Sequence, residues 1–196
     1  MNAMRTIAGV AVVVAGALLM QGCATKPTVR AEYDQGVDFS KYHSFNFASP
    51  LSTDKQGYST LVTQQLKSAV THEMQQRGYT LDSTPDLLVN FSGRLEDKQS
   101  IESTPTAYYG YRYYGAWPGY SMGSDVYTVN YTQGTLNVDL IDAKSMQMVW
   151  EGVTVGEVTK KHLKNREEAI NKAVGNVFAK YPFQAGNAQP IEVATK

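Results

Sequence analysis

Apolar residues recur along the chain with two different periods, and these predict several strands and two helices. Apolar and polar positions alternate from Leu87 to Leu95, the period of a strand with one buried face. Two longer strand-like segments, 126–141 and 147–158, are joined by residues 142–145, whose composition is typical of a hairpin turn. Shorter strands are predicted at 29–33, 42–47 and 79–81. Residues 103–123 interrupt the pattern and are predicted to form a long loop.

Two other segments repeat apolar residues every three to four positions, as amphipathic helices do. The first runs from Leu61 to Met74, and Gly78 follows where a left-handed C-cap is wanted. The second covers residues 165–181 and stops at Pro182. Clustered strands with two helices separated in sequence predict an α+β fold, with a mainly antiparallel sheet and two amphipathic helices packed on one face.

The first 22 residues have the character of a secretory signal. Arg5 precedes an uncharged run over residues 7–20, which is shorter than the roughly 20 residues that span a bilayer. Residues 20–24, Met-Gln-Gly-Cys-Ala, then resemble the lipobox of bacterial lipoprotein precursors. The resemblance implies cleavage before Cys23 and lipidation of its thiol. Because Ala24 rather than Asp follows, it also implies an outer-membrane protein that faces the periplasm.

These boundaries divide the chain into a signal peptide (1–22), a lipidated tether (23–28), one α+β domain (29–183) and a flexible polar tail (184–196). With 18 basic and 18 acidic side chains the net charge is zero, so we expect no nucleic-acid partner. One cysteine makes neither an internal disulfide nor a Cys-rich zinc site. The three histidines lie far apart in the sequence, and we expect neither a metal nor a cofactor.

Four segments resemble the envelope lipoproteins of domain-of-unknown-function family 4136. They are residues 33–42, residues 76–89, residues 134–152 and the end of the final helix at 179–182. Within or beside them, the motif residues are Asp34, Asp38, Phe39, Tyr42, Gly78, Asp86, Gly134, Asp139, Asp142, Trp150 and Gly152. The resemblance to this family implies no particular activity, ligand or partner.

We interpret these motif residues as structural. Asp34 and Asp38 flank a Gly-containing turn, where carboxylates accept nearby backbone N–H bonds. Asp139 and Asp142 are three positions apart, so in a regular strand they face opposite sides and do not form one acid–base pair.

A stretch rich in tyrosine is the strongest candidate for a contact with a ligand or partner. Its residues are Tyr108, Tyr109, Tyr111, Arg112, Tyr113, Tyr114, Trp117 and Tyr120. Three interpretations stay open: aromatic stacking on the sugars of peptidoglycan or lipopolysaccharide, a contact with lipid headgroups or an envelope protein, and a long loop of tolerated composition.

Two further motifs carry candidate chemistry. Residues 119–123 spell G-x-S-x-G, which with Ser121 and His162 suggests a serine hydrolase, but the strand–turn–helix context of that motif is missing. Residues 160–166 form a basic cluster, either a solvated surface or a site for an anionic lipid or lipopolysaccharide phosphate. We therefore expect no enzyme, but a non-catalytic binding, assembly or envelope-maintenance module.

Overall fold

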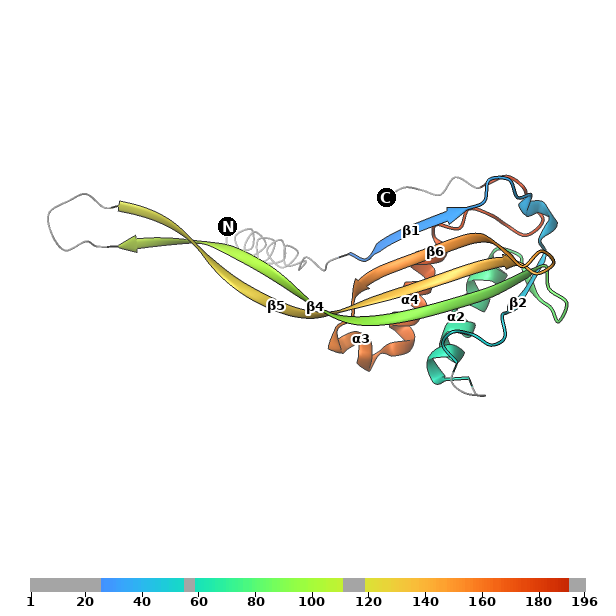
Figure 1. Cartoon of the computed structure of the whole chain (residues 1–196), viewed down its shortest axis with the longest axis horizontal. Coiled ribbons are helices and arrows are strands. Elements are labelled where there is room, and N and C mark those ends of the chain that lie inside the picture. Colours follow the sequence, from blue (N-terminus) through green and yellow to red (C-terminus); the bar gives the residue numbers. More distant parts are fainter. Residues whose placement is uncertain (1–25, 55–58, 111–118, 191–196) are drawn as a thin grey trace, which may run out of the picture.

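The computed structural model of the chain describes residues 26–54, 59–110 and 119–190. It has one six-stranded sheet of order β1-β6-β5-β4-β2-β3 (Figure 1). The strands are β1 (Thr28–Tyr33), β2 (Ser44–Phe47), β3 (Thr80–Leu81), β4 (Leu87–Gly110), β5 (Gly119–Asp142) and β6 (Gln147–Glu157).

The prediction of a mainly antiparallel sheet is wrong, because the sheet is mixed. The pairs β1–β6, β6–β5 and β5–β4 are antiparallel. Strand β2, in contrast, pairs in parallel with both β4 and β3. A helix lies between β2 and β3 in the chain, and such a crossover connection brings the second strand back in the same direction as the first.

The structure has three α-helices in its described residues, one more than predicted: α2 (Leu61–Gln76), α3 (Lys160–Lys164) and α4 (Arg166–Phe178). Thr60 caps α2 by accepting a hydrogen bond from the Thr63 N–H at 3.1 Å. Gly78, with φ +85°, follows α2 in the left-handed conformation that glycine adopts easily. The additional helix α3 lies in the basic cluster, where Thr159 supplies the cap.

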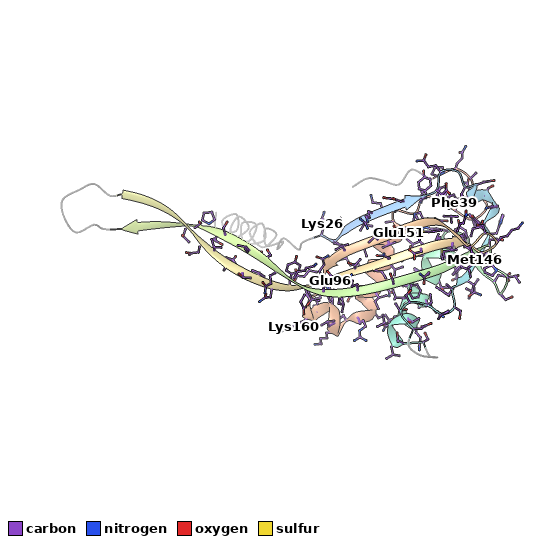
Figure 2. The ribbon with its side chains drawn as sticks, in the orientation of Figure 1. Lys26, Phe39, Glu96, Met146, Glu151 and Lys160 are labelled. Atoms are coloured by element: carbon purple, nitrogen blue, oxygen red, sulfur yellow. The ribbon has the colours of Figure 1, made fainter. Side chains whose placement is uncertain are left out.

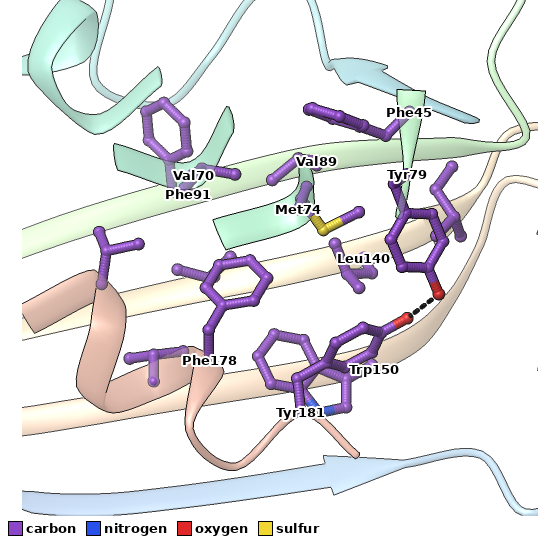
Figure 3. Packing of buried hydrophobic residues seen from close by; sticks show 14 of the residues in the cluster. Phe45, Val70, Met74, Tyr79, Val89, Phe91, Leu140, Trp150, Phe178 and Tyr181 are labelled. Carbon is purple, nitrogen blue, oxygen red and sulfur yellow. Dashed lines mark hydrogen bonds between the residues drawn. The ribbon is translucent and has the colours of Figure 1, made fainter. Parts of the chain in front are cut away.

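The core is formed by side chains from the sheet and from α2 and α4, together with the segment after α4 (Figure 3). Fully buried members include Val89 and Phe91 of β4, Leu140 of β5, Trp150 of β6, Val70 and Met74 of α2, and Val177 and Phe178 of α4. At Gly152 the layers approach so closely that a Cβ atom would lie 2.5 Å from Val177 Cγ1 and would also overlap the Trp150 ring. Glycine is therefore required there by space.

Strands β4 and β5 continue far beyond the rest of the sheet as a two-stranded ribbon (Figure 1). The last pair between β5 and β6 is Gln133 with Glu157, whereas β4 and β5 stay paired out to Gly110 and Gly119. We call residues 96–110 and 119–132 the arm. At about 3.3 Å per residue it extends roughly 50 Å from the body of the domain.

The arm corrects the prediction of a long loop over 103–123. Most of that segment is strand, paired in continuous register, such as Thr104 with Asp125. Alternation between apolar and polar residues marks a strand when one face is buried. In the arm both faces are largely exposed, so the sequence carries little contrast between them.

The segment expected to be a polar tail from residue 184 begins against the domain. The Ala185 N–H donates to the Arg77 carbonyl at 2.9 Å, and the Gly186 N–H donates to the Tyr42 carbonyl at 3.0 Å. Residues 191–196 lie outside the described residues.

Candidate functional site

The motif residue Asp142 ties together the end of the sheet away from the arm. One carboxylate oxygen accepts from Lys41 Nζ and Tyr42 Oη, both at 2.8 Å. The other accepts from the backbone N–H groups of Lys144 and Ser145, both at 2.9 Å. Burial alone raises the pKa of Asp142, but these hydrogen bonds outweigh it and hold the pKa well below its usual range. A carboxylate held in this way is a structural acceptor and a weak base.

The other motif carboxylates in turns also accept bonds from nearby groups. Asp34 accepts from the Gly36 N–H at 2.8 Å, and Asp38 accepts from the Ser40 N–H at 2.9 Å and its hydroxyl at 2.7 Å. Asp86 accepts from the backbone N–H groups of His43 and Ser44, at 2.8 and 3.0 Å. These bonds organise the chain on either side of β2, as Asx-type turns do.

Aromatic motif residues lie in the core rather than at a surface. Phe39 stacks on Phe183 with ring centroids 3.7 Å apart, and it meets Tyr42 edge to face. The Trp150 ring packs edge to face against Tyr181, with centroids 5.1 Å apart. Their burial makes them part of the folding core.

Asp139 lies on the other face of the sheet, in a row of polar side chains. The register aligns Glu32, Glu151, Asp139 and Asn90 across four strands. The Asn90 amide donates to Asp139 at 3.2 Å, while burial and the neighbouring Glu151 charge raise the pKa of Asp139. Among the described residues, no group of three or more His, Cys, Asp or Glu side chains is placed to hold a metal ion.

Motif residue Gly134 marks the base of the arm. A Cβ atom there would lie 2.6 Å from Val158 Cγ2 and 3.5 Å from Leu95 Cδ2. The glycine thus leaves room for the Val158 side chain beside β5, where the Val158 N–H donates to the Thr132 carbonyl at 2.8 Å. The β5–β6 register is regular at Gly134, and it shifts between Leu140 and Ile141.

The tyrosine-rich stretch falls on the outer part of the arm. The register pairs Tyr108 with Ser121 and Tyr109 with Tyr120. The remaining members of the stretch, Tyr111, Arg112, Tyr113, Tyr114 and Trp117, lie outside the described residues, and so does Cys23.

The structure does not bring Ser121 and His162 together. Ser121 lies within strand β5, twelve residues from Gln133, which at about 3.3 Å per residue is roughly 40 Å. His162 lies beside the base of the arm, where the Thr159 N–H donates to its Nδ1 at 3.3 Å. The G-x-S-x-G segment therefore forms no turn between a strand and a helix.

Sequence patterns missed the apolar residues exposed at and along the arm. Leu95, Ile101 and Val126 have exposed fractions of 63%, 76% and 66%. That these residues lie together can be recognised only once β4 and β5 are paired. The register then places Ile101 opposite Thr128 and Val126 opposite Ser103, on one face. No described helix is long and apolar enough to cross a membrane.

Comparison with solved structures finds distant likenesses. A PDZ domain protein from Parabacteroides distasonis has a TM-score of 0.52 at 15% identity, over 84% of this chain and 38% of that one. The chain thus spans well under half of that protein, and the likeness concerns the fold alone. Two PelC dodecamer structures from Paraburkholderia phytofirmans, at 12% and 11% identity, cover 79% and 82% of this chain and 99% of theirs, both with TM-scores of 0.39.

Comparison with curated proteins gives no match. Comparison with models of protein families gives one match, which spans almost the whole described domain, from β1 to the segment after α4. The model of the domain of unknown function DUF4136 matches residues 29–183, and the chain therefore belongs to this family.

Proposed function

We propose that this protein is a lipid-anchored lipoprotein of the bacterial outer membrane that faces the periplasm. We further propose that it is a non-catalytic binding module whose contact element is the arm. The observation that carries the second proposal is the arm itself. It projects about 50 Å from the domain, and every member of the core cluster in the described chain lies outside it.

A projecting ribbon of this kind needs a reason beyond folding. An isolated two-stranded ribbon is marginally stable in water, and unpaired strand edges favour association with other molecules. The described arm contributes no residue to the core cluster, yet it carries exposed apolar residues and five tyrosines, Tyr108, Tyr109, Tyr120, Tyr127 and Tyr131. A contact outside this domain accounts for both features.

The anchor proposal is supported by the lipobox-like sequence around Cys23, which ends a charge-free run of signal-peptide length. Several acyl chains bound to one cysteine hold a protein firmly at a membrane, since each buried methylene contributes about 0.8 kcal/mol. The domain then begins only five residues later, at Thr28.

The non-catalytic proposal is supported by the arrangement of the titratable groups. Asp34, Asp38, Asp86 and Asp142 all accept hydrogen bonds that fix turns, and Ser121 and His162 lie far apart. Catalysis by a serine or a carboxylate pair requires groups within hydrogen-bond reach of one substrate.

In-cell photocrosslinking tests the role of the arm. A photoreactive amino acid is placed at Ser103 in the arm and, as a control, at the exposed Gln75 of α2. We expect the probe at Ser103 to form a crosslink to another component of the envelope, and the probe at Gln75 to form none. An equal pattern from both positions, or adducts from Gln75 alone, contradicts the role of the arm.

Fractionation tests the anchor in the same cells. Wild type is expected in the outer-membrane fraction with a lipidated N-terminal peptide by mass spectrometry, whereas Cys23→Ser is expected to be soluble or unprocessed. Unchanged membrane fractionation of Cys23→Ser contradicts the anchor.

A further inference from the structure

The two faces of the arm differ in charge. In an antiparallel pair, residues directly opposite each other share a face, and alternate residues change face. On one face, Asp97 and its register partner Thr132 lie at the base of the arm, and the residues from Gln99 outward carry no charge. We call this outer part the uncharged face; it contains Gln99, Ile101, Ser103 and Pro105 of β4 with Ser124, Val126, Thr128 and Asn130 of β5. The opposite face carries Lys98, Glu102 and Asp125, and Tyr127 donates to Glu102 there at 3.2 Å.

The backbone register continues beyond Pro105 and Ser124. The next register pairs in the same alternation are Ala107 with Met122 and Tyr109 with Tyr120. An exposed apolar patch that is rimmed by uncharged polar residues marks a surface that contacts another molecule or a membrane.

The expected anchor joins the molecule at the base of this arm. Thr28, the first residue of β1, lies in one register row with Val155, Thr135 and Arg94, next to the point where the arm begins. Five residue steps from Cys23 to Thr28 span at most about 18 Å. Because the arm is far longer than this tether, a bilayer that holds Cys23 passes close to the junction between body and arm.

The tether also approaches the side of the sheet to which the uncharged face belongs. Gly134 and Gly156 are register partners, so their Cβ positions point to one face. A Cβ on Gly156 would lie 3.1 Å from Pro27 Cβ, and one on Gly134 would lie 3.5 Å from Leu95 Cδ2. Leu95 and Ile101 are an even number of residues apart in β4 and therefore share that face.

A basic helix lies beside the same junction. Helix α3 carries exposed Lys160, Lys161 and Lys164, and Glu167 and Glu168 follow only in the first turn of α4. Figure 2 shows Lys26, Glu96 and Lys160 around the place where the arm leaves the body. Lysines at this position suit anionic headgroups, to which basic residues near a membrane surface are attracted.

We propose that the uncharged face of the arm lies in the headgroup layer of the membrane that holds the lipid anchor, with the face that carries Glu102 and Asp125 turned to water. This inference takes the anchor at Cys23 from the proposed function. The arm then fixes the orientation of the domain on the membrane, because attachment at one point alone does not set it.

Site-directed fluorescence on the full lipidated chain tests this arrangement. Because lipidation occupies the only native thiol, a new cysteine gives one labelling site. Ile101→Cys and Val126→Cys place a polarity-sensitive dye on the uncharged face, and Glu102→Cys and Asp125→Cys are matched controls one residue away. The protein is reconstituted in vesicles of phosphatidylethanolamine and phosphatidylglycerol.

We expect lipid-borne quenchers to act several-fold more strongly on the dyes at 101 and 126 than on those at 102 and 125, with the reverse order for aqueous iodide. Equal quenching at all four positions overturns the proposal. Shielding of positions 101 and 126 from both quenchers also overturns it, because a protein then covers the face. If dilution removes that shielding, the covering protein is a second copy of this chain.

A second pair of variants changes charge rather than label position. With the dye at Ser103→Cys, the double variant Ile101→Asp/Val126→Asp is compared with Ser100→Asp/Thr104→Asp, which adds the same charge to the opposite face. We expect a loss of lipid quenching in the first double variant only. Equal quenching in both overturns the proposal.

The mass of the N-terminal peptide separates the two possible failures. If Cys23 carries no lipid, the proposed anchor fails. If Cys23 is lipidated and the arm is quenched equally on both faces, only the membrane contact of the arm fails.

Discussion

The change Asp142→Asn tests how the motif carboxylate holds the end of the domain. In the native structure one oxygen of Asp142 accepts from Lys41 Nζ and Tyr42 Oη, and the other accepts from two backbone N–H groups. An asparagine keeps one acceptor oxygen, which still serves the backbone groups. Its NH₂ group replaces the oxygen that accepts from Lys41 and Tyr42.

The size of the effect follows from the burial of these partners. The Lys41 side chain is half exposed and turns to water, so its loss adds little. The Tyr42 hydroxyl is buried, and a buried donor that loses its acceptor costs about 1–3 kcal/mol. Together with weaker backbone bonds to a neutral acceptor, we expect about 2–3 kcal/mol, or a Tm lower by about 5–10 °C for a domain of this size.

The loss of stability in Asp142→Asn, relative to wild type, also depends on pH in a defined direction. Because the folded pKa of Asp142 lies below its usual range, the carboxylate stabilises the fold fully above the unfolded value of about 3.9. This stabilisation is lost as the pH falls through the folded pKa. The difference between wild type and variant should therefore be constant from about pH 7 to pH 5 and shrink below about pH 4.

Thermal unfolding followed by circular dichroism at several pH values measures both effects. Asp125→Asn is the control, since it removes the same charge from an exposed position on the arm. The assigned role of Asp142 is wrong if Asp142→Asn has the same Tm as this control at pH 7. It is also wrong if the loss of stability relative to wild type stays constant down to pH 2.

Three further predictions concern packing in the body and the independence of the arm. Gly152→Ala should lower the free energy of unfolding by about 1–3 kcal/mol or more, because its Cβ meets Trp150 and Val177; chemical denaturation with an unchanged midpoint would refute this close packing. The Tyr79 and Tyr181 hydroxyls are 2.7 Å apart and buried, so each single change to Phe should cost about 1–3 kcal/mol and the double change less than the sum, as a double-mutant cycle measures. Replacing residues 100–129 by Asn-Gly should leave the Tm of the body within about 2 °C of wild type, since the core cluster lies outside the arm; calorimetry that shows a large drop would make the arm part of the fold.

The parts of the fold that were predictable are those with strong contrast between buried and exposed positions. The alternation from Leu87 to Leu95 and the helical repeat from Leu61 to Met74 correspond to β4 and α2. Strands β2 and β3 have four and two residues, too few to reveal that their pairing is parallel.

The arm was not predictable because its signal depends on pairing. Ile101 and Val126 are 25 positions apart and isolated in the sequence, and they share a face only through the β4–β5 register. The composition of this region, rich in aromatic residues, indicates a contact surface. Composition does not distinguish a loop from a ribbon that is exposed on both faces.

Protease protection in native envelopes tests most directly whether the arm is the contact element. Envelopes from permeabilised cells and detergent-solubilised protein are treated with a nonspecific protease, and the cleavage sites are mapped by mass spectrometry. We expect residues 96–132 to be cut in the solubilised protein and protected in the envelope, with the body intact in both. Equal cleavage of the arm in envelope and detergent would contradict the proposal that it is in contact there.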